Sequence, residues 1–318
     1  MNNFRPMKGE QIDDLSKVKF PVFVSPKIDG IRCLFKDGKL CTYTLKPIPN
    51  IHINVSLSPK LDQILAGMGI DSSRVILDGE LTIGSPSDPD CFRKTTSGVM
   101  SIEGTPEYTF HVFDFLVVGQ EHVAFHMRYD AAESLGNISE YVPEFAGIKA
   151  VKHRLVTNLG KLESYKEVIL NAGYEGIIGR SHLGLYKFGR STLNEQYMFK
   201  FKKVKDDEAV VIGMEPLYKN TVESIPDHLG LKKKTKRKEN MVAQDTMGKL
   251  LVRDIKTGVE FKIGSGFTDD ERVMFWTFGE VANGMIIKYA HHDHGAKDKP
   301  REPRFLGIRH PDDMEVSE

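Results

Sequence analysis

Residues 24–35 read VSPKIDGIRCLF, and this stretch decides how the fold of the chain is interpreted. A lysine, an aspartate and an arginine (Lys27, Asp29 and Arg32) follow a short apolar run that is typical of a buried strand. Charged side chains at the end of a strand are either ordinary surface charges or groups that are placed to react. The rest of the sequence is needed to decide between the two interpretations.

The composition is that of a soluble globular protein. With 318 residues the chain exceeds what one hydrophobic core usually fills, so two domains are expected. The chain has no run of about 18 apolar residues and its N-terminus has no apolar signal segment, so we expect no membrane partner. Its 3 cysteines lack C-x-x-C spacing, which fits a reduced, cytoplasmic setting and excludes a tetracysteine zinc site.

Residues 1–205 mix strand and helix patterns. Residues 31–44 alternate around Asp37-Gly38, which predicts a hairpin. Further strand patterns occupy 21–24, 75–84, 108–118, 174–180 and 196–214, and helical patterns occupy 61–68 and 160–173. The polar stretch SPSDPDCFRKTTSG (85–98) is expected to form a loop.

Residues 206–318 have a different character. Short strand patterns at 208–214, 249–255 and 259–267 are separated by turns, and one helix is expected at 268–279 with Thr268 as its N-cap. Several short strands with one helix suit a small β-barrel. The sequence therefore predicts an α+β protein with domains 1–205 and 206–318.

Charged residues recur inside the apolar strands of the first domain. Since side chains alternate along a strand, Asp78 and Glu80 share a face, as do Lys200 and Lys202. Buried charge is costly unless it is paired or bound to a ligand, so these residues predict a polar cleft. Cations and carboxylates together suit a nucleoside triphosphate with Mg²⁺, and a lysine among other cations should have a lowered pKa. No G-x-x-x-x-G-K-[ST] motif is present, so the phosphate site is not a P-loop.

KIDGIR (27–32) matches the K-x-D-G-x-R signature of the covalent nucleotidyltransferases, which comprise DNA ligases, RNA ligases and mRNA capping enzymes. The segments LDGEL, FHVFDFL, YEGIIGR and FKFKKVKDDEA follow in the order of that family. The chain most resembles a compact, bacteriophage-type ATP-dependent DNA ligase. The resemblance implies an antiparallel-sheet, ATP-grasp-like nucleotidyltransferase domain followed by an OB-fold β-barrel.

The resemblance also implies roles for single residues. Lys27 would take AMP from ATP, while Lys200 and Lys202 would hold the α-phosphate and lower the pKa of Lys27. Arg32 would contact the ribose or an incoming 5′-phosphate, and Glu80 would bind the ribose hydroxyl. The remaining roles are adenine stacking for Phe113, a divalent metal for Glu175, metal or phosphate for Asp78, and orientation of the pyrophosphate for Arg301, Arg304 and Arg309.

The chain departs from the family pattern after the first hairpin. The family usually has an arginine there, where this chain has CTYTLKPIP (41–49). Tyr43 or Lys46 could substitute, and the sequence does not decide between them. The last motif is also unusual, because RHPDDM follows it in place of Asp-Lys.

The resemblance implies that the partner is duplex DNA with a nick. It also implies a monomer that works in the cytoplasm of a phage host, in DNA replication, repair and recombination. Its cofactors would be ATP and Mg²⁺, and Mn²⁺ could replace Mg²⁺. ATP is expected in place of NAD⁺ because only 26 residues precede Lys27, which leaves no room for an NAD⁺-specific domain. Six cations in KKKTKRK would bind DNA phosphates: Lys232, Lys233, Lys234, Lys236, Arg237 and Lys238. The segment HHDHG (291–295) lacks strong metal-ligand spacing.

Three alternatives stay open at this point. An RNA ligase or an mRNA capping guanylyltransferase would carry the same signature. A duplex-DNA-binding protein with a decayed site would also fit, although the presence of Lys27, Glu80 and Glu175 argues against it. Each charged residue named above also has an ordinary structural interpretation as a surface charge or a strand's polar face.

Overall fold

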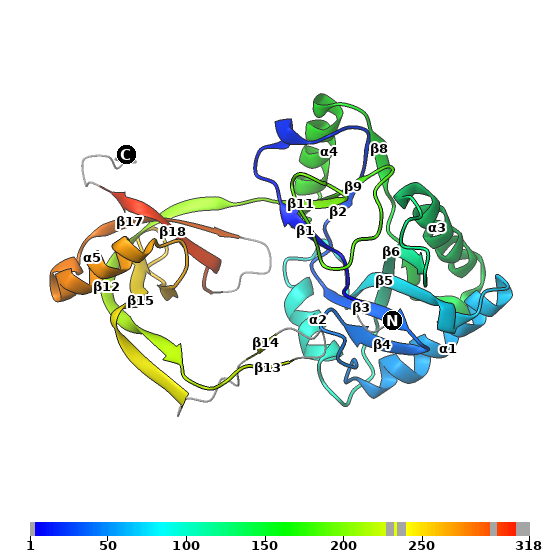
Figure 1. The fold of residues 1–318 in the computed structure, drawn as a ribbon, viewed down its shortest axis with the longest axis horizontal. Helices are drawn as coiled ribbons and strands as arrows, with labels where there is room; N and C mark the ends of the chain where they lie inside the picture. The colour runs from blue at the N-terminus through cyan, green and yellow to red at the C-terminus, as the bar shows by residue number, and fades with distance from the viewer. Residues whose placement is uncertain (1–3, 227–231, 234–239, 293–297, 310–318) are drawn as a thin grey trace. The chain divides into compact units, whose positions relative to one another are not determined.

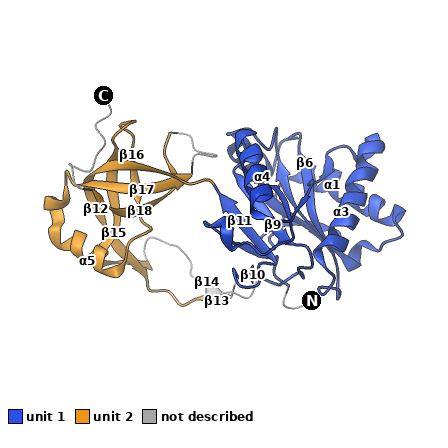
Figure 2. Cartoon of the chain, turned by 90° about the horizontal axis from the view of Figure 1, so that it is seen from above, with its two compact units in different colours: residues 1–202, 228–230 blue, residues 203–227, 231–318 orange. Residues whose placement is uncertain are grey.

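A computed structural model describes residues 4–226, 232–233, 240–292 and 298–309 (Figure 1). Its contacts divide the chain into two compact units at Lys202–Lys203 (Figure 2). The sequence pattern had placed this boundary at 205/206. None of the described helices is both long enough and apolar enough to cross a membrane.

The first unit contains two sheets. The first has the order β10-β1-β11-β9-β2-β8. Its strands are β1 (Lys8–Gln11), β2 (Val22–Pro26), β8 (Arg154–Val156), β9 (Gly176–Ser181), β10 (Arg190–Ser191) and β11 (Met198–Lys202). The second has the order β4-β3-β5-β6-β7. Its strands are β3 (Ile31–Lys36), β4 (Lys39–Thr42), β5 (Val75–Thr82), β6 (Thr109–Val117) and β7 (Ile148–Ala150).

The two sheets are mostly antiparallel, as expected. Parallel pairs occur where β1 joins β10 and β11, and where β6 joins β7. The predicted hairpin is confirmed: β3 pairs with β4, and Asp37 and Gly38 both have positive φ, as a two-residue hairpin turn requires. The strand pattern over 196–214 corresponds to two strands, β11 and β12 (Lys205–Asn220), which belong to different units.

Helices cover these sheets on their outer faces (Figure 1). They are α1 (Ile51–Gly67), α2 (Cys91–Val99), α3 (Phe125–Tyr141) and α4 (Leu159–Asn171), with 3₁₀ turns at Leu15–Lys17, Ser72–Arg74 and Pro143–Phe145. Side chains from α1 and α3 pack with the second sheet in the largest core cluster, and α4 contributes to a separate cluster with the first sheet. A third cluster, which includes Met7, Leu34, Ile76 and Met198, joins the two sheets.

Two local predictions in this unit are wrong. The stretch 85–98 is not all loop, because α2 begins at Cys91 and buries Cys91, Thr95 and Val99 at intervals of four residues. Helix α1 begins ten residues before the predicted 61, although Pro59 lies inside it. Asn50 caps its first turn, and the buried Ile53 and Leu57 extend its apolar face. The stabilisation from the cap and from this burial outweighs the loss of the backbone hydrogen bond that Pro59 cannot donate.

The second unit is a curved antiparallel sheet with the order β16-β15-β12-β17-β18. Its elements are β12 (Lys205–Asn220), β15 (Met241–Asp254), β16 (Glu260–Ile263), α5 (Asp269–Phe278), a 3₁₀ turn (Gly279–Ala282), β17 (Ile286–His292) and β18 (Arg301–Arg309). A bridge from Ser265 to Arg304 connects the two edges, and the interior is apolar, as in a small barrel. The predicted helix is confirmed with a complete capping box between Thr268 and Glu271.

Most of the basic block lies outside the described residues. The backbone of β14 (Lys232–Lys233) pairs with β13 (Ile225–Pro226), and nothing further is described for the block 232–238.

Candidate active site

Lys27 lies in the short connection between β2 and β3. These two flanking strands belong to different sheets of the first unit. Its backbone N–H donates to the carbonyl oxygen of Gly176 at 2.8 Å. This connection requires glycine at position 30, because a Cβ there would lie 2.2 Å from the carbonyl oxygen of Leu81. The backbone of the KIDGIR segment is thereby held against β5 and β9.

The Lys27 ammonium donates to the carboxylate of Glu175, which immediately precedes β9. Lys202 on β11 lies 2.7 Å from the other carboxylate oxygen of Glu175. Glu175 therefore sits between two lysines, and its side chain is only 1% exposed, whereas that of Lys27 is 19% exposed. Burial opposes the charge of Glu175, but Lys27 and Lys202 outweigh it and lower the pKa of Glu175 to about 2.

The expected lowering of the Lys27 pKa is wrong in this arrangement. Burial does lower it, but the negative charges of Glu175, Glu80 and Asp29 outweigh burial and raise the pKa of Lys27 above its ordinary value. The neighbouring Lys200 is the residue whose pKa is lowered, first by burial and then by the charges of Lys202, Lys27 and Lys8. Other cations do lie near Lys27, but Glu175 contacts it directly and is the charge that contributes most to its raised pKa.

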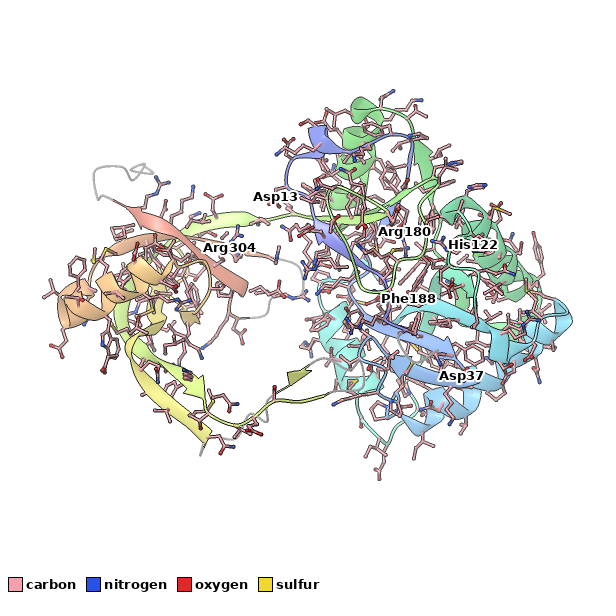
Figure 3. All side chains as sticks on the ribbon, viewed as in Figure 1. Asp13, Asp37, His122, Arg180, Phe188 and Arg304 are labelled. Atoms are coloured by element: carbon pink, nitrogen blue, oxygen red, sulfur yellow. The ribbon has the colours of Figure 1, made fainter. Side chains whose placement is uncertain are left out.

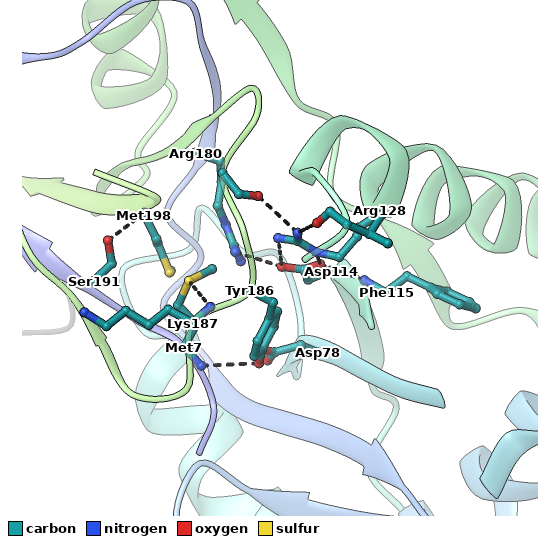
Figure 4. Close-up of polar contacts among 12 residues, drawn as sticks. Met7, Asp78, Asp114, Phe115, Arg128, Arg180, Tyr186, Lys187, Ser191 and Met198 are labelled. Carbon is teal, nitrogen blue, oxygen red and sulfur yellow. Dashed lines mark hydrogen bonds and ion pairs between the residues drawn. The ribbon is translucent and has the colours of Figure 1, made fainter. Parts of the chain in front are cut away.

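Arg32 on β3 is held by Asp78 on the neighbouring strand β5. Its Nε donates to Asp78 Oδ1 at 2.8 Å and its Nη2 donates to Oδ2 at 2.5 Å, a two-point pairing. The hydroxyl of Tyr186 donates to the same Oδ2 at 2.8 Å (Figure 4). Both oxygens of the buried Asp78 are engaged, so its geometry favours a role in positioning Arg32 over one as a metal ligand.

Glu80, two residues further along β5, lies opposite Arg32 in the strand register. Burial raises the pKa of Glu80 to about 7, although the charges of Lys27 and Arg32 act against that shift. Near neutral pH this carboxyl therefore changes readily between donor and acceptor. Either form can hydrogen-bond a hydroxyl group.

A pocket of about 220 Å³ brings most of the predicted residues together. It is lined by Lys8, Gly9, Ser25, Pro26, Lys27, Ile28, Arg32, Glu80, Phe113, Val151, His153, Ile178, Arg180, Met198 and Lys200. The lining combines an aromatic ring and aliphatic side chains with several cations. Such a pocket suits a ligand with a flat apolar part and a strongly anionic part.

A buried ionic network supports the Phe113 side of the pocket (Figure 4). Asp114 accepts from Arg128 Nε and from Arg180 Nη1, both at 2.8 Å, and all three side chains are almost fully buried. Arg180 points into the interior of the first unit (Figure 3), and its guanidinium carbon lies 5.5 Å from the centroid of the Phe113 ring. The guanidinium carbon of Arg32 lies at the same distance from that centroid, so two arginines contact the ring.

Among the pocket residues to which the sequence gave no role are Lys8, His153, Arg180 and Met198. Arg180 ends the quoted segment YEGIIGR, but nothing in its spacing indicated a buried pair with Asp114. Lys8 lies 19 residues before Lys27 in an unremarkable segment, and the parallel pairing of β1 with β10 and β11 brings it to the pocket. These contacts are long-range and leave no local pattern.

The predicted arginines of the last motif lie in the second unit, on β18. Arg304 pairs with Ala290 in the strand register, and Arg309 lies 3.6 Å from Glu208. His291 contacts Asp207 at 2.9 Å and His292 contacts the carbonyl oxygen of Lys203 at 3.0 Å, while 293–295 lie outside the described residues. Within the described ranges, no three His, Cys, Asp or Glu side chains converge as a metal site.

Known proteins of one kind are similar to this chain. The family "ATP dependent DNA ligase domain" matches residues 6–202, and "DNA ligase OB-like domain" matches residues 240–309. A solved Chlorella virus DNA ligase–adenylate is 30% identical, with 97% of this chain and 99% of that chain covered and a TM-score of 0.52. A solved structure from a study of Lig E DNA ligases is 25% identical, with 96% and 99% covered and a TM-score of 0.65. The bacteriophage T7 ATP-dependent DNA ligase, 15% identical with 97% and 99% covered and a TM-score of 0.50, shares the fold. No curated protein matches the chain.

Proposed function

Since the chain belongs to the ATP-dependent DNA ligase family, we propose that Lys27 is the amine that takes AMP from ATP during nick sealing. One observation carries this assignment. The Lys27 side chain reaches the wall of the pocket that Phe113 and Lys200 also line, and it is held there by Glu175, which is itself paired with Lys202. The aromatic ring offers a stacking surface for adenine, and the lysines offer charge for phosphates.

The proposed reaction has three transfers at phosphorus. The lone pair of Lys27 Nζ forms a bond to the α-phosphorus of ATP, and the bond from that phosphorus to the bridging oxygen breaks to release pyrophosphate. An oxygen of the 5′-phosphate at a nick then forms a bond to the same phosphorus, and the bond from that phosphorus to Lys27 Nζ breaks, which frees the lysine. Finally the 3′-hydroxyl attacks that 5′-phosphate, and AMP leaves with the electron pair of the broken bond.

Glu175 would control when Lys27 becomes nucleophilic. A protonated amine has no lone pair, and in the structure the charges of Glu175, Glu80 and Asp29 raise the pKa of Lys27 and so favour its protonated form. If the charge of Glu175 is neutralised when the substrate binds, burial and the nearby Lys200 would favour the free amine. The ion pair therefore positions the amine first and releases it later.

Magnesium fits this site as a partner of the triphosphate. Mg²⁺ usually takes one or two protein carboxylates and completes its shell with water and phosphate oxygens, so the described residues need not supply three ligands. We propose that Glu175 would hold it by exchanging one of its two lysine contacts for the metal, with Mn²⁺ as a substitute. A bound divalent ion would supply the neutralising charge that the preceding step needs.

The charge of Glu175 can be tested directly by Glu175→Gln. Because this change removes the negative charge that raises the Lys27 pKa, we expect Lys27 to become a free amine at lower pH than in the wild type. The measurement is the pH dependence of acylation of Lys27, followed by peptide mass spectrometry without ATP, with the exposed Lys39 as an internal standard. A midpoint that stays in place or rises would contradict the proposed role of Glu175.

Nicked duplex DNA is the substrate that we propose for the second and third transfers. The basic block 232–238 would bind its backbone phosphates, which predicts an affinity that falls with salt. Arg304, with Arg301 and Arg309, would act on the pyrophosphate group from the second unit. The chain would work as a monomer, in the cytoplasm of a host cell if a phage encodes it.

One experiment separates this function from its alternatives. The protein is incubated with Mg²⁺ and α-labelled ATP or GTP, and then with nicked DNA or nicked RNA duplexes. We expect AMP on the protein from ATP only, and sealing of nicked DNA. Transfer of GMP would indicate a capping enzyme, sealing of RNA alone would indicate an RNA ligase, and DNA binding without nucleotide transfer would indicate a non-catalytic protein.

A further inference from the structure

Lys8, at the start of β1, contributes a cation to the pocket that the proposed function does not yet use. Its ammonium nitrogen lies 5.9 Å from the centroid of the Tyr43 ring, within the range of a cation–π contact. In the part of the chain that the structure describes, Lys8 makes this contact and no ion pair with a carboxylate. Its charge is therefore available to a ligand.

Most other cations around the pocket are already compensated. Lys27 and Lys202 share Glu175, and Arg32 is paired with Asp78. Lys8 adds positive charge beside these pairs, and its effect is felt at Lys200, where it contributes to the lowered pKa. An excess of positive charge in a partly enclosed pocket favours an anionic ligand.

Tyr43 occupies the region after the first hairpin where the family usually has an arginine. The tyrosine ring cannot neutralise an anion, but it contacts two cations that come from different strands. The guanidinium carbon of Arg32 lies 5.5 Å from the centroid of the ring, and the ammonium of Lys8 lies 5.9 Å from it. Lys8 on β1 thus places a positive charge beside the Tyr43 ring.

We propose that Lys8 binds a phosphate group of the substrate and that the Tyr43 ring holds its ammonium in place beside Arg32. This inference rests on the proposed function, because it names a further substrate-binding residue of the same site. Lys8 would be the contacting group and Tyr43 a positioning residue. Two phosphates have the required chemistry: the triphosphate of ATP and the 5′-phosphate at the nick.

The test is Lys8→Met, which keeps a long side chain and removes the charge. Three steps are measured separately: AMP transfer from ATP to the protein over a range of ATP concentrations, AMP transfer from charged protein to a nick, and sealing of a pre-adenylated nick. We expect one or more steps to weaken about ten- to a hundredfold, since charged hydrogen bonds have contributions of that size. A raised KM for ATP assigns Lys8 to the triphosphate, and a defect in the later steps assigns it to the 5′-phosphate.

Matched variants separate a phosphate contact from a structural effect. Lys8→Arg should retain the affected step, and Tyr43→Arg should restore it in the Lys8→Met background by returning a cation to position 43. Tyr43→Phe keeps the ring and should retain the affected step, whereas Tyr43→Leu should weaken the same step as Lys8→Met. Lys17→Met, at an exposed lysine that is paired with Asp14, is the control and should change none of the steps.

The outcomes also distinguish this inference from the proposed function. If the wild type acquires AMP and seals nicks, but Lys8→Met stays within twofold of it in all three steps, the assignment of Lys8 is wrong and the function stands. If the wild type acquires no AMP, the proposed function itself fails. A defect that the arginine variants do not rescue would also overturn the assignment.

Discussion

Lys27→Arg and Lys27→Ala are both expected to abolish AMP transfer to the protein, by roughly 10⁴-fold or more, as removal of a nucleophile does elsewhere. The arginine variant is the sharper of the two. It keeps a cation opposite Glu175, so the local charge balance is preserved. A guanidinium cannot lose its proton in a protein, however, and so offers no lone pair to phosphorus. The measurement is the mass gain of one AMP after incubation with ATP and Mg²⁺.

The same two variants should retain the last transfer. In that step the 3′-hydroxyl attacks the adenylated 5′-phosphate, and Lys27 forms no bond. Sealing of a pre-adenylated nick should therefore persist at a rate that can be measured, while sealing with ATP is lost. Lys39→Ala changes an exposed lysine of β4 and should behave as wild type in both assays. AMP found on any residue other than Lys27 would contradict the assignment.

Elements with local signals were predicted well from the sequence. The hairpin turn at Asp37-Gly38 needs two residues with positive φ. Aspartate followed by glycine adopts this conformation readily, so the residue types predict the turn. Helix α5 announces itself through the Thr268 cap. Helix α3 gave no such signal, because its buried residues include Arg128, Gly136 and Ser139. Arg128 is buried through its ion pair with Asp114 on β6, and a Cβ at position 136 would lie 2.5 Å from the backbone nitrogen of Ala150, so both depend on tertiary contacts.

The candidate site was also predicted only in part from the sequence. Charges inside apolar strands indicated Lys27, Glu80, Glu175 and Lys200 as site residues. The structure places Lys27, Glu80 and Lys200 in the wall of the pocket, and Glu175 contacts Lys27. Residue types could not give the distances between them. A count of nearby cations suggested a lowered pKa for Lys27, but one carboxylate in direct contact outweighs more distant like charges. The charge state of this amine was therefore a question of geometry that the sequence could not answer.

Asp114→Asn is the substitution with the largest expected effect on stability. Asp114 is fully buried and compensates two buried guanidinium groups, those of Arg128 and Arg180. An amide of the same size leaves both arginines without a counter-charge in the interior. Loss of one partner from a buried ion pair costs about 3–5 kcal/mol, so we expect the first unit to lose stability on that scale. Asp130→Asn, at an exposed aspartate of α3, removes the same charge and should change little.

Urea unfolding can locate this effect because the chain has 1 tryptophan, Trp276, in the second unit. Circular dichroism follows the unfolding of both units, whereas Trp276 fluorescence follows that of the second. For Asp114→Asn we therefore expect a lower urea midpoint than in the wild type by dichroism and an unchanged transition by fluorescence.

Burial alone would raise the pKa of Asp114, but the charges of Arg128 and Arg180 outweigh burial and lower the pKa below its ordinary value. The stabilisation by this carboxylate is therefore present above the ordinary pKa of aspartate and is lost as pH falls through the folded value. The difference between wild type and Asp114→Asn should shrink in acid; a difference that is absent at neutral pH would show that the two arginines do not need this charge.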